Sequence, residues 1–87
     1  MKTFNCVLAV LDKGFVYHGN LVIEDDGWFT LTSVRNVRRF GTSRGLGQLA
    51  LTGPTKETAL DPCNTVRGAI GGLMHIIECE PSKWEGK

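Results

Sequence analysis

The sequence predicts an all-β domain, a small five-stranded barrel with one short helix in an insertion. Three observations carry this prediction. Apolar and β-branched runs recur at spacings of about 8–12 residues, glycine-containing turns separate them, and 87 residues suffice for only one domain. In so short a chain, a curled sheet leaves the fewest unpaired strand edges, which favours a barrel.

The first hairpin is expected within residues 4–24. The apolar run at residues 4–11 is typical of a buried strand, and the turn at 12–14 ends in a glycine, which accepts positive φ at little cost. Residues 15–24 resume the β pattern. Gly19 interrupts this second strand and therefore predicts a bulge or a bend.

A third strand is expected after an Asp-Asp-Gly turn. Residues 28–34 alternate β-branched and aromatic side chains, and the pattern continues to Phe40. Phe29 and Leu31 share one face of such a strand, so we expect them to point into the core. Trp28 then lies on the opposite face, where it is available for a ligand or a second subunit.

An insertion at about residues 41–64 is expected to carry the helix. The Leu-x-x-Leu-Ala pattern of residues 46–50 places its apolar side chains on one face of a helix of about two turns. Thr42 or Ser43 is positioned to cap this helix by accepting a hydrogen bond from a first-turn N–H. The Gly-Pro pair at 53–54 ends it.

The rest of the chain supplies two more strands. Residues 55–64 show no clear periodicity and predict an exposed loop. Residues 65–67 form a short strand, and a double glycine then provides a bend into the last strand. The domain is expected to span residues 1–80, followed by a polar tail at 81–87.

Composition excludes few functions. The formal net charge of +1 indicates no class of partner. Three cysteines without a C-x-x-C pair argue against a disulfide framework and a four-cysteine zinc site, and favour a reducing cytoplasm. Cys6 and Cys79 are expected to be small buried strand residues. The sequence shows neither a signal-peptide pattern nor the ~20 apolar residues that cross a bilayer.

The segment Arg35–Pro54 has the composition of a ligand site. Four of its arginines lie within ten residues, beside a glycine-rich turn. Guanidinium groups bind phosphate through two parallel hydrogen bonds, and helix N-termini favour anions. Arg38 and Arg39 point to opposite faces of a regular strand, so at most one of them shares a phosphate with Arg44. The alternative interpretation is solvated arginines beside a capped helix.

Exposed aromatic side chains would complete a nucleotide site by stacking on a base. We expect Trp28 or Phe40 to fill this role, whereas aromatic residues of a small barrel otherwise belong to the core. The glycine pattern lacks the Lys-Ser/Thr pair of a Walker loop. The candidate ligand-binding residues are Trp28, Arg38, Arg39, Phe40, Thr42, Ser43, Arg44 and Gly45.

The sequence contains no evident catalytic or metal-binding constellation. His18 and His75 are far apart, and neither belongs to a zinc-protease motif. A dyad between a histidine and Cys6 or Cys79 would lack a third residue to orient it. We therefore predict a binding protein that is not an enzyme and needs no cofactor or metal.

Parts of the chain resemble the Sm-like proteins, the LSm and Hfq group. The resemblance lies in the glycine turn and bent strand of residues 13–21, the acidic turn and strand of 25–31, and the closing strands 66–68 and 73–77. It implies an Sm- or SH3-like barrel, ring formation and RNA binding. Residues 40–64 are an insertion relative to that pattern.

The chain also resembles a group of small phage-encoded proteins of uncharacterised function. The motifs are Phe-Gly-Thr at 40–42, Gly-Leu-Gly-Gln-Leu-Ala at 45–50 and Gly-Pro-Thr at 53–55, followed by the Val-Arg strand at 66–67. The resemblance implies a viral origin and action in the host cytoplasm. Small phage proteins of this size are often counter-defence factors, and some sequester a nucleotide signal.

These observations lead to one main hypothesis and two alternatives. The main hypothesis is a homo-oligomeric phage protein that sequesters a cyclic oligonucleotide or an ADP-ribose derivative between subunits without cleaving it. One alternative is an inhibitor that docks on a host defence enzyme, which predicts an exposed apolar patch. The other is an Sm-like RNA-binding protein, whose affinity would fall steeply with salt.

Overall fold

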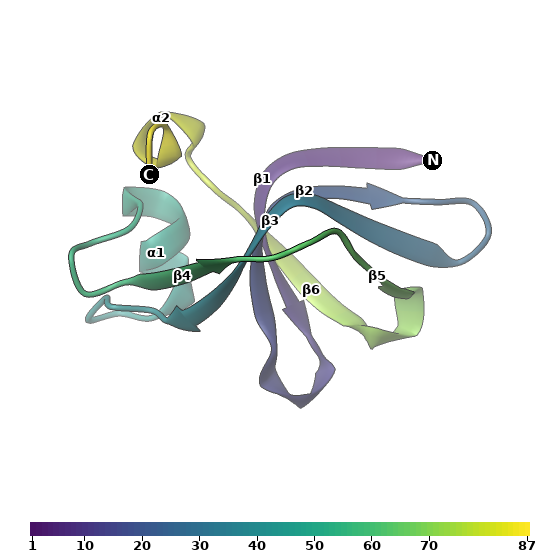
Figure 1. The fold of residues 1–87 in the computed structure, drawn as a ribbon, viewed down its shortest axis with the longest axis horizontal. Helices are drawn as coiled ribbons and strands as arrows, with labels where there is room; N and C mark the ends of the chain where they lie inside the picture. The colour runs from purple at the N-terminus through teal and green to yellow at the C-terminus, as the bar shows by residue number, and fades with distance from the viewer.

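The computed structural model, which describes residues 1–87, contains one antiparallel sheet with a short helix pair at one end (Figure 1). The helices are α1 (Leu46–Thr52) and α2 (Pro81–Trp84), and 3₁₀ turns occupy Asp12–Gly14 and Ile70–Gly72. The strands are β1 (Lys2–Leu11), β2 (Val16–Ile23), β3 (Trp28–Arg39), β4 (Ala59–Pro62), β5 (Val66–Ala69) and β6 (Leu73–Glu78).

The sheet has the strand order β4-β3-β2-β1-β6, and β5 also pairs with β3. The long strand β3 pairs with both short strands: its first half pairs with β5 and its second half with β4. The prediction of a β-rich fold with tight turns is confirmed. The sheet has six strands where five were expected, and the pairings leave it unclosed, so the barrel itself stays a prediction.

Two irregularities bend the central strands. In β1 the register with β2 shifts between Phe4 and Val7, which produces a bulge at the point where β1 turns sharply (Figure 1). The β2–β3 register shifts on either side of Gly19. A Cβ there would lie 2.9 Å from the Thr32 carbonyl oxygen, so the close approach of β3 requires glycine. The irregularity predicted at Gly19 is confirmed.

The bent sheet buries side chains on both of its faces. The β1 residue Leu8 belongs to a cluster with Leu49, Ala50 and Trp84 of the two helices. Its neighbours Val7 and Ala9 point the other way, into a second cluster that includes Leu21, Phe29, Leu31 and Val34. Because β1 is buried on both faces, its sequence is a continuous apolar run, as a doubly covered strand requires.

Two segments differ from their prediction. Residues 55–64, expected to be a loop, contain β4, an edge strand. Four residues are too few to display a period, and an edge position tolerates Pro62. The expected polar tail at 81–87 contains α2, whose Trp84 is 5% exposed and packs in the helix-side cluster.

Glycines at both ends of α1 allow a matched test of this packing. Gly45 and Gly53 have φ of 81° and 83°, a region that other residues rarely adopt. A Cβ at Gly45 would meet nothing within 4 Å. A Cβ at Gly53 would collide with the backbone of Lys83, a residue of α2. We expect Gly53→Ala to reduce the free energy of unfolding by ~2 kcal/mol more than Gly45→Ala, measured by urea denaturation. Equal losses would contradict the packing of α1 against α2.

Candidate functional site

The segment predicted to bind phosphate connects β3 to α1. Arg38 donates from Nε to Asp61 Oδ2 at 2.8 Å, so its charge is already paired across the β3–β4 edge. This bond raises the pKa of Arg38 and lowers the pKa of Asp61. Arg39 and Phe40 are exposed at the end of the strand. Arg38 is therefore not free to bind a ligand phosphate unless Asp61 releases it.

The prediction that Thr42 or Ser43 caps α1 is wrong. Gly45 occupies the N-cap position, and no side chain caps it. The Thr42 hydroxyl donates to the Gly45 carbonyl at 2.7 Å, and Ser43 donates to Gln48 Oε1 at 3.3 Å. Gln48 Oε1 also accepts from the Arg44 backbone N–H at 2.8 Å. The loop thus makes its own hydrogen bonds, because Gln48 reaches back over the first turn.

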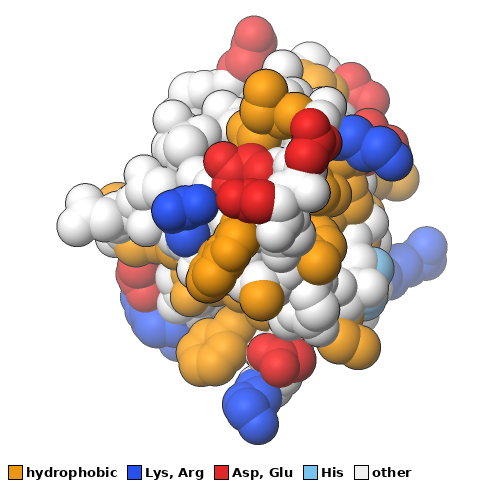
Figure 2. Space-filling view, turned by 90° about the vertical axis from the view of Figure 1, so that its right-hand side faces the viewer, with side chains coloured by type: hydrophobic (Ala, Val, Ile, Leu, Met, Phe, Trp, Pro, Cys, Tyr) orange, Lys and Arg blue, Asp and Glu red, His pale blue; other side chains and the backbone are white.

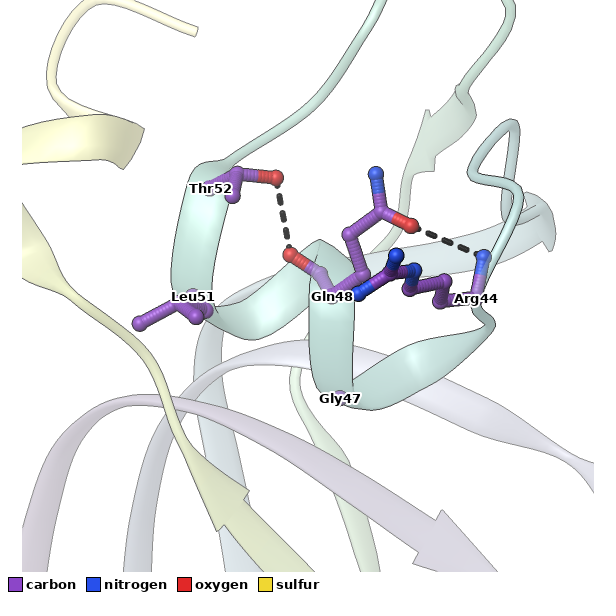
Figure 3. Close-up of a pocket in the computed structure, with 5 residues that line it drawn as sticks. All are labelled: Arg44, Gly47, Gln48, Leu51 and Thr52. Atoms are coloured by element: carbon purple, nitrogen blue, oxygen red, sulfur yellow. Dashed lines mark hydrogen bonds between the residues drawn. The ribbon is translucent and has the colours of Figure 1, made fainter.

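Arg44 lines a pocket of about 360 Å³ on the outer side of α1. Figure 3 shows its side chain extending toward Gln48 along the helix. Thr52, which donates to the Gln48 carbonyl at 2.8 Å, and the exposed Leu51 complete the lining together with Gly47. Arg44 has no acidic partner within salt-bridge distance. The pocket therefore offers one unpaired cation beside hydrogen-bonding groups and one apolar side chain.

Trp28 lies at the opposite end of β3 from these residues. The strand has 12 residues and rises about 3.3 Å per residue, so one protomer cannot place both ends on one small ligand. As expected, Trp28 is exposed while Phe29 and Leu31 are buried. The structure thus brings Arg39, Phe40 and the residues 42–45 into one region and leaves Trp28 outside it.

A second pocket of about 450 Å³ is lined by residues of β5, the following 3₁₀ turn and Phe29, and it includes Arg67. The guanidinium of Arg67 lies 5.7 Å from the Trp28 ring centroid and donates to Glu24 and Thr30, each at 3.3 Å. Figure 2 shows this end of the molecule, where acidic, basic and apolar side chains alternate over the surface. With Arg67 already paired to a carboxylate, this pocket is less favourable to a phosphate than the pocket of Arg44.

The structure also assembles a three-residue cluster that corresponds to no sequence motif. Cys6 of β1, His18 of β2 and Cys79, which follows β6, bring their ligand atoms within 4.8 Å of one another. Cys6 Sγ lies 3.6 Å from His18 Nε2. His18 and Cys79 are buried, and Cys6 is half-buried. No spacing motif could have predicted this cluster, because strand pairing alone brings residues 6 and 79 together.

Two residues around His18 fix its ring and its proton. Trp84 stacks on the imidazole with centroids 3.9 Å apart and an angle of 10° between the rings. The Arg35 guanidinium, which can only donate, lies 3.2 Å from Nδ1. Nδ1 is therefore the acceptor, and the proton of the neutral ring is on Nε2, facing Cys6. Arg35 therefore orients His18, a role for which the sequence showed no residue. However, the tautomer that Arg35 favours has its proton on Nε2, so His18 cannot accept a proton from Cys6.

Burial keeps all three groups of the cluster in their neutral forms. Desolvation and the Arg35 charge lower the pKa of His18 to about 4. Desolvation by burial, with Cys6 close by, raises the pKa of Cys79 to about 12, and burial also raises the pKa of Cys6. Since the thiolate is the nucleophilic form of cysteine, these shifts disfavour covalent catalysis at either residue.

Comparison with known proteins gives no assignment for this fold or these sites. No protein-family model matches the chain, and neither curated proteins nor solved structures give a match. Neither helix combines the length and apolar character needed to cross a membrane.

The two tryptophans provide a matched test of the cluster. Trp84 is almost fully buried against His18, whereas Trp28 is 46% exposed. We expect Trp84→Ala to reduce the free energy of unfolding by ~3–5 kcal/mol, and Trp28→Ala by about 1 kcal/mol or less. Urea denaturation followed by circular dichroism measures both losses. A small loss for Trp84→Ala would show that α2 does not stabilise the domain.

Proposed function

We propose that this protein binds a phosphorylated nucleotide-type ligand at the pocket of Arg44 and holds it without cleaving it. The observation that supports this most directly is the state of Arg44. It lines a pocket and has no acidic partner, whereas Arg38 and Arg67 are each paired with a carboxylate. A guanidinium without a carboxylate is the group that phosphate recognition requires.

In this proposal, the segment before α1 and the pocket wall supply the other contacts that such a ligand needs. Arg39 and Phe40 are exposed on the segment that leads into α1. Phe40 is 39% exposed, enough for one face of its ring to stack on a base. Gln48 and Thr52 add polar groups to the pocket wall. A cyclic oligonucleotide or an ADP-ribose derivative carries both the phosphate and the base that this arrangement would bind.

The biological role that fits such binding is sequestration of a host immune signal by a phage protein. The resemblance to small phage-encoded proteins suggests this role, and the pocket is its physical basis. Trp28 would contribute only from a second subunit, because it lies at the other end of β3. In this proposal a ligand between subunits contacts Arg44 of one protomer and Trp28 of the next.

The finer architecture in this proposal is an Sm- or SH3-like barrel that self-associates. Two features support it: β5 and β4 pair with successive halves of one bent strand, and a 3₁₀ turn links β5 to β6. The outer strand β6 pairs only with β1, so its other edge is free to pair with a second copy. Light scattering after gel filtration measures the resulting oligomer, and a strictly monomeric protein would remove the shared site.

A thermal-shift screen tests the binding proposal. The purified protein is heated with cyclic di- and trinucleotides, ADP-ribose derivatives and short RNA. A ligand at 100 times its dissociation constant stabilises the protein by ~2.7 kcal/mol, which raises the melting temperature by about 10 °C or more in so small a domain. We expect one nucleotide class to produce this shift and to be recovered intact after heat denaturation.

Arg44→Ala and Arg67→Ala form the matched pair for locating the site. Both remove one exposed arginine, from opposite ends of the molecule. We expect Arg44→Ala to abolish the shift with an unchanged melting temperature of the free protein, and Arg67→Ala to retain the shift. The reverse result would assign the phosphate to Arg67 and remove Arg44 from the site. A salt-sensitive shift with RNA alone would favour the Sm-like alternative, and turnover of the ligand would make the protein an enzyme.

A protein-docking inhibitor is the second candidate function. Its support is the presence of large apolar side chains that the fold leaves exposed, among them Phe15, Trp28, Leu51 and Met74. If no nucleotide stabilises the protein, capture of one host enzyme at equal stoichiometry, lost on Phe15→Ser or Met74→Ser, would establish this function instead.

A further inference from the structure

The cluster of Cys6, His18 and Cys79 has the dimensions of a metal centre. A tetrahedral zinc ion with bonds of about 2.3 Å to sulfur and 2.05 Å to nitrogen separates S and N by about 3.6 Å, and two sulfurs by about 3.8 Å. The observed Cys6 Sγ–His18 Nε2 distance is 3.6 Å, and all three atoms lie within 4.8 Å of one another. Contraction by about 1 Å or less would close the site.

The backbone is shaped to bring Cys6 into this position. Cys6 has φ of +59°, a left-handed conformation that costs about 1 kcal/mol or more for a non-glycine residue, and it sits in the β1 bulge. The Asn20 side chain accepts the Cys6 N–H at 3.1 Å, and the Cys6 carbonyl accepts the Cys79 N–H at 2.9 Å. Two hydrogen bonds, one to Asn20 and one to Cys79, thus hold this residue in its left-handed conformation.

We propose that Cys6, His18 and Cys79 bind one zinc ion, with the fourth coordination position open to water or an added ligand. Two sulfurs and an imidazole form a soft donor set, which selects zinc over magnesium or calcium. Three protein ligands and one open position are typical of a reactive zinc centre. Cys6 is the only half-buried member of the cluster, and Trp84 stacks on the imidazole of His18.

Binding requires a defined movement of protons. The two thiols each release one proton to solvent and bind the ion as thiolates. The proton on His18 Nε2 must leave that nitrogen before the metal binds there. The neutral ring then carries its proton on Nδ1. Nδ1–H would then face the Arg35 guanidinium, which now lies 3.2 Å away and has no acceptor. Arg35 must therefore turn aside, so its present contact opposes the metal. Zinc binding at this cluster does not require nucleotide binding at Arg44.

Metal titration under reducing conditions tests the proposal. The metal-free protein is titrated with Zn²⁺ against a chromophoric chelator, and with Co²⁺ to detect the absorption of a tetrahedral thiolate complex. We expect one ion per chain. Cys6→Ser should weaken zinc binding by more than about 100-fold, because loss of a direct ligand exceeds the 10–100-fold loss typical of outer contacts. The exposed Cys63 provides the matched control, and Cys63→Ser should leave the affinity unchanged.

Further variants keep the test decisive. Cys79 is buried, so the zinc affinity of Cys79→Ser is interpreted only if its circular dichroism spectrum matches that of the parent protein. Cys6→Ser alters a half-buried side chain, and its zinc affinity is sufficient to test the site. Arg35→Gln should tighten zinc binding severalfold, because the amide oxygen can accept from Nδ1–H. Weaker zinc binding by Arg35→Gln would contradict the opposing role of Arg35. The absence of stoichiometric zinc, or equal losses in Cys6→Ser and Cys63→Ser, would overturn the site.

Discussion

Burial of β1 on both faces is the constraint on which the rest of this structure depends. Val7, Leu8 and Ala9 are completely inaccessible to solvent. β2 and β6 pair with this strand on its two sides, so residues from the beginning, middle and end of the chain meet there. One face needs helices to cover Leu8, and the other needs the curled part of the sheet to cover Val7 and Ala9. The positions of both helices and the bend of the sheet follow from this requirement.

The C-terminal residues complete the helix-side core. Trp84 contacts His18 in the sheet, and its Nε1–H donates to the Ala50 carbonyl at 3.3 Å, while the Glu80 N–H donates to the same carbonyl at 2.9 Å. Arg35 donates to the Lys87 carbonyl at 2.7 Å. The chain after β6 therefore joins α1 to the sheet, and its Trp84 covers the imidazole of His18.

Local patterns in the sequence were sufficient for the strands that are long or bounded by turn residues. The alternation from Trp28 placed Phe29 inside and Trp28 outside, and the Leu-x-x-Leu-Ala spacing located α1. β4 and α2 were missed because each has four residues, too few to show a period, and because their partners are distant in the chain. The strand propensity of the β4 residues could not predict this strand, because β4 forms by pairing with the edge of β3.

The candidate site was predictable only where its residues are close in sequence. Arg39 to Gly45 form one region because they are one segment, but the sequence could not show that Asp61 pairs with Arg38 or that Gln48 takes the capping role. Trp28 was predicted to belong to the same site only because an exposed aromatic ring can stack on a base. In the structure, the length of β3 separates Trp28 from the other candidate residues. The thiol–imidazole cluster had no local signal, since its members are brought together by strand register and a bulge.

The unequal environments of the two tryptophans have a consequence for optical experiments. Trp84 lies in a nearly dry setting, stacked on an imidazole and close to a guanidinium at 6.0 Å, whereas Trp28 is open to solvent under Arg67 at 5.7 Å. Their fluorescence therefore differs in colour and in accessibility to dissolved quenchers. The blue-shifted component reports on the end with the Cys6–His18–Cys79 cluster, and the red-shifted one reports on the end where β3 begins. One unlabelled sample thus carries separate optical reporters for its two ends.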